Sequence, residues 1–202
     1  NNPKIKIIYQ KNKGLVVTNN IALRIANGKF IIRLDADDFF DHNAFLVLFN
    51  KIASDDNIGL VYPDYFVVDE DDNILFVRQR EDIETIELKD HPAHGACTLI
   101  RTEFLKQIGG YDEDFNCQDG YYLWLNFVSK FKVANINTPL FYYRRHNNNL
   151  TNNSDKIYRT RAAIKTKYFD QNFLEQDKIF AVIPIRGNNS IANKIALNKI
   201  GT

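Results

Sequence analysis

Apolar runs and helical patterns alternate along the first half of the chain, and this alternation is what most constrains its fold. Residues 29–34 (KFIIRL) form an apolar run with almost no polar alternation, which is typical of a strand covered on both faces. Residues 15–28 before it and 43–53 after it carry apolar side chains at helical spacing. Strands that alternate with helices indicate an α/β fold, in which helices flank a sheet.

The same patterns predict the remaining elements. In chain order we expect strands at 5–9 and 58–63, a hairpin at 64–78 that turns at 71–73, a strand at 94–101, helices at 102–110 and 119–131, a strand at 139–146 and a helix at 156–170. The side chains expected to point inward are Leu15, Ala22, Ile25 and Ala26 in the first helix, and Phe45, Leu48, Phe49 and Ile52 in the second.

Three carboxylates, Asp35, Asp37 and Asp38, follow the run 29–34 within four positions. In an extended chain alternate side chains share a face, so Asp35 and Asp37 are expected to point the same way. Carboxylates at the carboxyl end of such a strand suit Mg²⁺ or Mn²⁺, which also bind substrate diphosphates. Alternatively, Asp38 or Asp41 only caps the next helix. Spacing alone leaves both interpretations open.

A second acidic run, residues 69–72, invites comparison with a calcium-binding loop. An EF-hand that began at Asp69 would need glycine at position 74 and glutamate at position 80. Ile74 and Arg80 stand there instead. We therefore expect a solvated hairpin turn.

The charge and composition exclude several classes of function. A net charge of +1 gives no electrostatic reason to expect nucleic acid as a partner. No apolar stretch approaches the length of a membrane span, and the first ten residues carry no signal-peptide core. Cys97 and Cys117 stand apart rather than in a CxxC pair, which favours reduced thiols in a cytoplasmic protein.

Several motifs, in order along the chain, resemble those of the family 2 glycosyltransferases, which are enzymes with a GT-A fold. They span residues 5 to about 151 and read NKG…TNNIALRIANGKFIIRLDADD, VYPDYFVVDEDDNIL, HGACTLIRTEFLKQIGGYDEDF, QDGYYLWLNF and PLFYYRRHNNNLT. The resemblance implies a GT-A-like (Rossmann-like) mixed sheet flanked by helices, formed by a domain of residues 1–170.

The resemblance also implies roles for individual residues. Asp35 and Asp37 correspond to the DxD carboxylates that hold the divalent ion and the donor sugar nucleotide, with Asp38 beside them. Asp119 corresponds to the general base, and His146 to a residue near the metal and the diphosphate. The remaining positions are Arg144 and Arg145 at the leaving group of the donor, and His94, Gly95 and Trp124 along the acceptor wall.

Each of these assignments has a structural alternative. Asp119 at a helix start also fits an N-cap, and His146 beside two arginines also fits an exposed, solvated residue. The indole of Trp124 packs in a core more readily than it stacks on a sugar. His91 and His94 form an HxxH pair, but without a third ligand such a pair is usually incidental.

The chain departs from the family pattern in three places. Gln118 replaces a glutamate and Asn126 a helix arginine. Family members begin with a strand, a helix and an Asp-containing loop that bind the nucleotide base. This chain starts after them and contains no methionine, so we expect an N-terminally truncated domain. Residues 171–202 resemble a connector and the start of a sugar-nucleotide cytidylyltransferase of the CMP-sialic acid synthetase type, with Arg186 and Gly187 in its nucleotide loop.

The leading hypothesis is a metal-dependent inverting glycosyltransferase. It transfers a sugar from a nucleotide-sugar donor to a glycan or lipid-linked acceptor in surface polysaccharide assembly. We expect a cytoplasmic protein that approaches a membrane peripherally, through its acceptor only. The alternatives are an inactive fragment or sugar-binding remnant, and one part of a bifunctional glycosyltransferase/cytidylyltransferase.

Overall fold

The chain divides into two compact units in the computed structural model, Asn1–Gln171 and Asn172–Thr202. The structure describes residues 2–80, 92–147, 149 and 153–173. All described residues except 172 and 173 therefore belong to the first unit. The cytidylyltransferase-like positions Arg186 and Gly187, and His91 of the HxxH pair, lie outside the described residues.

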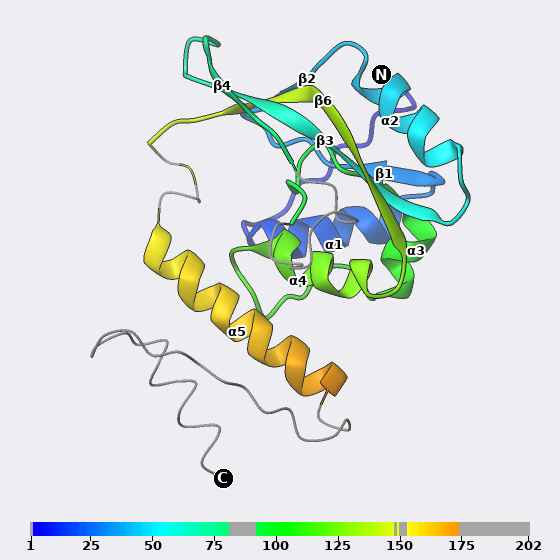
Figure 1. Ribbon diagram of the computed structural model, residues 1–202, viewed down its shortest axis with the longest axis vertical. Coiled ribbons are helices and arrows are strands. Elements are labelled where there is room, and N and C mark those ends of the chain that lie inside the picture. Colours follow the sequence, from blue (N-terminus) through cyan, green and yellow to red (C-terminus); the bar gives the residue numbers. More distant parts are fainter. Residues whose placement is uncertain (1, 81–91, 148, 150–152, 174–202) are drawn as a thin grey trace. The chain divides into compact units, whose positions relative to one another are not determined.

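A mixed sheet forms the centre of the first unit (Figure 1). Its strands run in the order β1-β5-β3-β6-β2, with β4 paired to β3. Strand β3 is parallel to β6, whereas the other pairs are antiparallel. The strands are β1 (Phe30–Ile32), β2 (Phe39–Phe40), β3 (Ile58–Val68), β4 (Ile74–Arg78), β5 (Leu99–Arg101) and β6 (Lys132–Arg144).

Helices cover both faces of this sheet (Figure 1). Helix α2 packs on one face, α1, α3 and α4 pack on the other, and α5 packs against α4. The helices are α1 (Leu15–Ile25), α2 (Ala44–Ala53), α3 (Thr102–Gln107), α4 (Asp119–Val128) and α5 (Ser154–Phe173). The expected mixed α/β sheet flanked by helices is confirmed.

Strand β3 is buried on both faces along most of its length, and the shorter β1 also contacts both cores, through Phe30 and Ile32 on one face and Ile31 on the other. Along β3, Val61 and Tyr65 face the core under α2, while Leu60 and Tyr62 face the core under α1, α3 and α4. Strand β1 lies at the edge of the sheet, where it pairs only with β5, and its three residues are half-buried. Two covered faces make a strand uniformly apolar, which is the pattern that β3 carries.

Three expectations about local structure are wrong. Residues 5–9 form no strand: no described strand pairs with them, and Tyr9 is 91% exposed. Helix α1 buries Val16, Asn20 and Leu23 instead of the predicted face. In α2, Leu48 and Ile52 are buried as expected, but Phe45 and Phe49 are about half exposed. Periodicity finds a helix more reliably than it finds the side that a neighbouring element covers.

The two cysteines agree with the sequence prediction, because Cys97 and Cys117 are both free and buried. Burial raises the pKa of the Cys97 thiol to about 12, so this thiol stays protonated. Within the described part of the chain, no helix is long and apolar enough to cross a membrane.

Candidate active site

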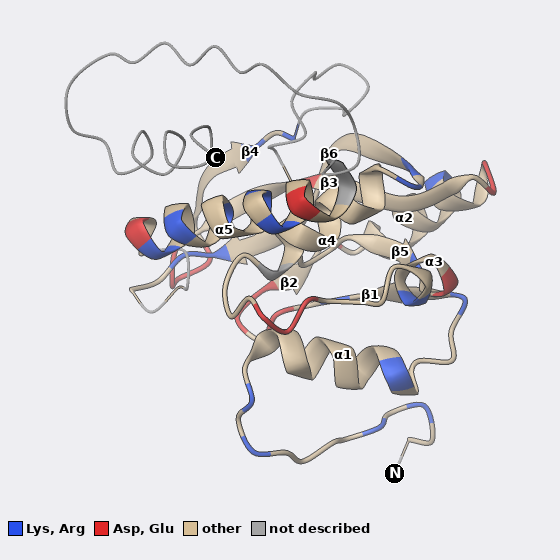
Figure 2. Cartoon of the chain, turned by 90° about the horizontal axis from the view of Figure 1, so that it is seen from below, with Lys and Arg blue, Asp and Glu red and all other residues tan. Residues whose placement is uncertain are grey.

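The three carboxylates lie in a turn that joins β1 to β2 (red between these strands in Figure 2). The backbone N–H of Asp38 donates to the carbonyl oxygen of Asp35 at 3.2 Å, so the chain is not extended here as expected. The N–H of Cys97 donates to the carbonyl oxygen of Arg33 at 2.9 Å, which ties the turn to the segment before β5. We call residues 35–38 the cavity turn.

Asp35 is paired with a cation from its own segment. Arg33 Nε lies 2.8 Å from Asp35 Oδ1 without hydrogen-bond geometry, and Arg33 Nη2 donates to Oδ2 at 3.2 Å, so the pair is an ion pair with one hydrogen bond. A Cβ at Gly95 would stand 2.5 Å from Arg33 Nη2. The absence of a side chain at position 95 therefore leaves room for this pair.

Asp37 is paired with His146, 109 positions further along the chain. His146 Nε2 lies 2.9 Å from Asp37 Oδ2, and the Asp37 side chain is 40% exposed. Strand pairing explains the meeting, because β2 follows the cavity turn and is antiparallel to the end of β6, with Phe39 opposite Tyr142. The expected proximity of His146 to the DxD carboxylates is thus present.

Asp38 differs from its two neighbours because it is buried, with 8% of its surface exposed. Its Oδ1 accepts the backbone N–H of Arg144 at 2.9 Å, while its Oδ2 has no hydrogen-bond partner. The pKa of Asp38 is raised to about 7, mainly by burial; the hydrogen bond from Arg144 opposes this rise, and the charges of Asp37 and Asp35 add to it. This carboxyl is therefore poised between its neutral and charged forms near neutral pH.

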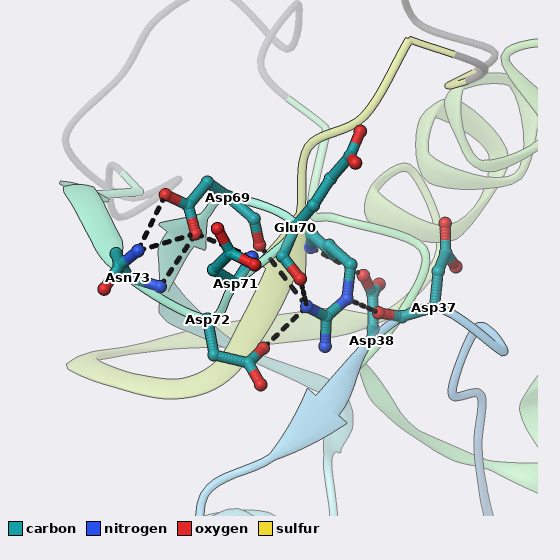
Figure 3. A network of polar contacts seen from close by, with 8 residues as sticks. Asp37, Asp38, Asp69, Glu70, Asp71, Asp72 and Asn73 are labelled. Atoms are coloured by element: carbon teal, nitrogen blue, oxygen red, sulfur yellow. Dashed lines mark hydrogen bonds and ion pairs between the residues drawn. The ribbon is translucent and has the colours of Figure 1, made fainter.

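Arg144 joins the cavity turn to the β3–β4 hairpin (Figure 3). Its Nε donates to the carbonyl oxygen of Asp37 at 2.9 Å, and its Nη1 donates to that of Glu70 at 3.0 Å. The same Nη1 lies 2.7 Å from Asp72 Oδ1. The guanidinium is occupied by these contacts, so its observed role is to hold two turns together. Arg144 is not among the described residues that line the large cavity considered below.

Arg145 is exposed and is not among the described residues that line the large cavity. Its backbone N–H donates to the carbonyl oxygen of Val68 at 2.8 Å. Its side chain lines a smaller pocket with the acidic hairpin turn and Asn147. Neither arginine of the YRRH segment therefore lines the space that the carboxylates of the cavity turn face.

A cavity of about 900 Å³ opens beside the cavity turn. Its walls come from α1, the cavity turn, the end of β4, the segment before β5, the start of α4, the end of β6 and α5. A cavity of this volume can hold a ligand the size of a cofactor or a drug molecule. The predicted site residues that line it are Asp35, Asp37, His94, Gly95 and His146.

His94 lies on an aromatic wall of the cavity. Its ring centroid lies 5.1 Å from those of Tyr65 and Phe141 and 5.0 Å from that of Tyr143. Its Nδ1 accepts the backbone N–H of Ala96 at 3.2 Å, which leaves Nε2 as the protonated nitrogen of the neutral ring. Aromatic packing and this hydrogen bond hold the ring in one orientation.

Asp119 is the first residue of α4, and its side chain lies outside what the structure describes. Its neighbours Gln118 and Gly120 both line the cavity. Gln118 adopts a left-handed backbone conformation with φ of 56°, which is uncommon for a residue with a side chain. Its Oε1 accepts a hydrogen bond from Arg161 Nε at 2.8 Å, so α5 helps to fix the start of α4.

Trp124 is not an acceptor contact, because it lies in the core rather than in the cavity. It is 2% exposed, and its ring meets that of Tyr62 edge to face, with centroids 5.4 Å apart. The described residues that line the cavity do not include it. Trp124 packs in this core because it lies on the side of α4 that faces the sheet, together with Leu123 and Phe127.

The sequence analysis did not identify four arginines that line the cavity, Arg33, Arg78, Arg80 and Arg161. Arg161 belongs to a helix in which Lys and Arg recur (Figure 2), and nothing in that pattern distinguishes it from the exposed Arg159. Arg78 and Arg80 lie two positions apart at the end of the hairpin, so a strand pattern places them on one side but does not show that this side faces a cavity.

The described residues contain no group of three or more His, Cys, Asp or Glu side chains already arranged to hold a metal ion. The oxygens and imidazole of Asp35, Asp37 and His146 are nevertheless ligands that suit a divalent cation, and all three residues line one cavity. The buried Oδ2 of Asp38, which has no hydrogen-bond partner, adds negative potential beside them. The residues present therefore fit a cation that takes its remaining ligands from a substrate.

Comparison with known sequences identifies a family. A family model for glycosyl transferase family 2 matches residues 1–109, more than half of the 202 residues. An uncharacterized glycosyltransferase of Methanocaldococcus jannaschii is 28% identical over 148 residues, which are 69% of this chain and 51% of that protein. A chondroitin synthase of Escherichia coli is 32% identical over 75 residues, which are 37% of this chain and 11% of that protein. The chain thus spans about half of the first relative and about a tenth of the second.

The fold is also similar to that of solved structures. The structure of S. aureus TarS 1–349 superposes with a TM-score of 0.60 at 14% identity and covers 81% of this chain and 47% of that one. The same TarS segment in complex with UDP gives a TM-score of 0.58 at 14% identity over 80% of this chain and 47% of that one. At this identity the likeness concerns the fold alone, and it confirms the GT-A-like architecture.

Proposed function

Because the chain belongs to glycosyltransferase family 2, we propose that its cavity binds a nucleotide-sugar donor and transfers the sugar to a glycan or lipid-linked acceptor. One observation carries this proposal: Asp35, Asp37 and His146, from segments more than a hundred positions apart, line one cavity of about 900 Å³. The binding of UDP by TarS, which shares the fold, supports a nucleotide diphosphate as the leaving group.

We propose that Asp35, Asp37 and His146 hold Mg²⁺ or Mn²⁺ together with the diphosphate of the donor. When bound, the cation neutralises the negative charge that develops on the departing diphosphate. Asp35 keeps its orientation through Arg33, and Asp37 keeps its orientation through His146. Asp38, held by the N–H of Arg144, adds negative potential behind them without entering the cavity lining.

In this proposal Asp119 is the general base of a single displacement. Its carboxylate takes the proton of the acceptor hydroxyl as the acceptor oxygen bonds to the anomeric carbon. The bond from that carbon to the diphosphate oxygen breaks in the same step, so the anomeric configuration inverts. Support comes from Gln118 and Gly120, which flank Asp119 and line the cavity. His94 and Gly95 form the wall along which the acceptor lies.

Donor hydrolysis tests this function without knowledge of the acceptor. The chain is incubated with UDP-glucose or UDP-N-acetylglucosamine and MnCl₂, and release of UDP is measured with and without EDTA. We expect slow release that requires the cation and is lost in Asp37→Asn. Asp119→Asn is expected to lose transfer to added glycan acceptors while it retains UDP binding.

Two outcomes would oppose the proposal. Binding of glycans without any donor turnover would favour a sugar-binding protein instead of an enzyme. Turnover that is unchanged in Asp37→Asn and in EDTA would remove the cavity turn from the reaction. Transfer into surface polysaccharide is tested afterwards, with lipid-linked glycans as acceptors.

A further inference from the structure

Three arginines face the cavity beyond the cation site, and the reaction proposed above assigns none of them. Arg78 ends β4, Arg80 follows two residues later, and Arg161 lies on α5. The side chains therefore approach one space from different elements. Cationic side chains gathered around a cavity favour a negatively charged occupant, since unpaired charge is costly to remove from water.

Arg80 carries the strongest sign of such a cost. It is half-buried, and this burial lowers the pKa of its guanidinium, as does the like charge of Arg78. The carboxylate of Asp64 attracts the Arg80 guanidinium, but its Oδ1 already accepts the backbone N–H of Arg80 at 2.7 Å. Two like charges held together in a cavity wall are stabilised when an anion binds between them.

Arg161 is held in place before any ligand binds. Its Nε donates to Gln118 Oε1 at 2.8 Å, and its guanidinium carbon lies 4.9 Å from the centre of the Tyr121 ring. The stacked, hydrogen-bonded side chain loses little further freedom on binding, and its remaining N–H groups are available for an oxyanion. Arg161 also adjoins the residue next to Asp119, where the acceptor hydroxyl would react.

The arginines near the hairpin end stand apart from the cation site along β3. The carbonyl oxygen of Val68 accepts the N–H of Arg145, next to His146, whereas Asp64 accepts the N–H of Arg80. Val68 and Asp64 are four residues apart on one strand, a separation of roughly 13 Å. A substrate in this cavity can therefore meet the cation site with one group and Arg78 and Arg80 with another.

We propose that Arg78, Arg80 and Arg161 bind a negatively charged group of the acceptor, so that the acceptor is an acidic glycan. The shared chemistry is an oxyanion on a sugar unit, either a uronic acid carboxylate or a phosphodiester. This inference rests on the proposed glycosyltransferase function, because it names the class of acceptor for the same cavity.

Binding of matched neutral and acidic sugars tests the inference independently of catalysis. Methyl β-glucuronoside, methyl β-glucoside and glycerol 1-phosphate are titrated into the full chain in the presence of UDP and MnCl₂, with saturation-transfer NMR as readout. We expect the glucuronoside or glycerol 1-phosphate to bind about 10-fold more tightly than the glucoside, as charge-assisted hydrogen bonds predict. The anion that binds more tightly identifies which source of oxyanion the acceptor carries.

Variants separate this site from the cation site. Arg80→Gln and Arg161→Gln are expected to abolish the preference for the acidic sugar, while Arg80→Lys retains part of it. Arg159→Gln on the exposed side of α5 is the matched control and should keep the full preference. Arg78 is exposed, so Arg78→Gln gives a further variant in which loss of folding is not expected.

Equal binding of the acidic and neutral sugars by the wild-type chain would overturn the inference. So would an Arg80→Gln variant that loses UDP binding but keeps the sugar preference, because the arginines would then serve the donor. Donor hydrolysis is measured on the same samples. Its absence would count against the proposed function, whereas its presence without acid preference would count against the acidic acceptor alone.

Discussion

Two acidic turns lie on either side of Arg144, and their carboxylates are satisfied in different ways (Figure 3). In the hairpin turn, residues 69–73, Asp69 Oδ1 accepts the backbone N–H groups of Asp71 at 3.0 Å and Asn73 at 2.9 Å. The hydrogen bonds from Asn73 lower the pKa of Asp69, the side-chain bond most strongly. Asp69 is thus satisfied mainly by residues of its own turn, whereas Asp72 pairs with Arg144.

The cavity turn satisfies its charge with residues from elsewhere. Asp37 pairs with His146 and Asp38 with the N–H of Arg144, each more than a hundred positions away, while only Asp35 has a neighbouring partner in Arg33. A carboxylate bound by local N–H groups stabilises a turn and has little left to offer a ligand. A carboxylate that faces a cavity beside a histidine can exchange that contact for a bound cation.

The largest difference between the two turns is expected in activity. Asp37→Asn keeps the shape of the side chain but removes its charge, so kcat/KM for donor hydrolysis should fall by about 1000-fold, the effect of losing a key electrostatic contact in an active site. Asp71→Asn in the hairpin turn is the matched control and should stay within about twofold of wild type. Similar losses in both variants would mean that the cavity turn has no special role.

The next effect is a pH dependence of stability in the cavity turn. The pKa of Asp38 is raised from 3.8 to about 7 in the folded chain, so the folded state keeps a proton that the unfolded state has released. Stability from this group is therefore complete below pH 4 and is lost as pH rises through about 7. The free energy of unfolding of Asp38→Asn should exceed that of wild type by about 3 kcal/mol at pH 8.

Urea unfolding of wild type and Asp38→Asn from pH 4 to pH 8 checks this expectation, because carboxylates remote from Asp38 contribute equally to both chains. A difference that does not change with pH would show that Asp38 is ionised throughout. The hairpin turn should show the opposite sign, because the pKa of Asp69 is lowered and its contribution is lost on acidification.

A smaller effect is expected when the link between the two turns is removed. Arg144→Gln loses the hydrogen bonds to the carbonyl oxygens of Asp37 and Glu70 and the ion pair with Asp72. We expect a loss of about 2 kcal/mol in the free energy of unfolding and a reduced affinity for the donor. Arg144→Lys should not restore either property, since one ammonium cannot replace a planar fork. Full rescue by lysine would indicate that only the charge at this position matters.

The smallest effect is expected in the hairpin turn itself. Asp69→Ala removes the acceptor for two backbone N–H groups in an exposed turn, so Tm should fall by roughly 2 to 4 °C. Donor hydrolysis should be unchanged at temperatures below the transition. A loss of activity larger than the loss of folded protein would show that the two turns are not separable.

The sequence predicts the general architecture and part of the site. Its apolar runs place most of the strands and helices, and the acidic run at 69–72 is read correctly as a hairpin turn because its residues bond to one another. The meeting of Asp37 with His146 follows from the family resemblance, since no local pattern links positions 109 apart.

Other features depend on packing that the sequence does not display. Arg144 and Arg145 are adjacent in the sequence, yet one bridges two turns and the other is exposed, because they point in different directions at the end of β6. Trp124 is turned into the core by its position on α4, and Arg161 reaches the cavity only because α5 packs on α4. Such roles are set by tertiary contacts rather than by spacing.

The cavity turn as a cation and diphosphate site is tested most directly by Mn²⁺ binding, followed by EPR as pyrophosphate is added. We expect pyrophosphate to increase the affinity of the wild-type chain for Mn²⁺ by about 10-fold or more, since the diphosphate supplies the ligands that the protein lacks. The increase should persist in Asp71→Asn and vanish in Asp37→Asn. An equal increase in wild type and Asp37→Asn would contradict the assignment.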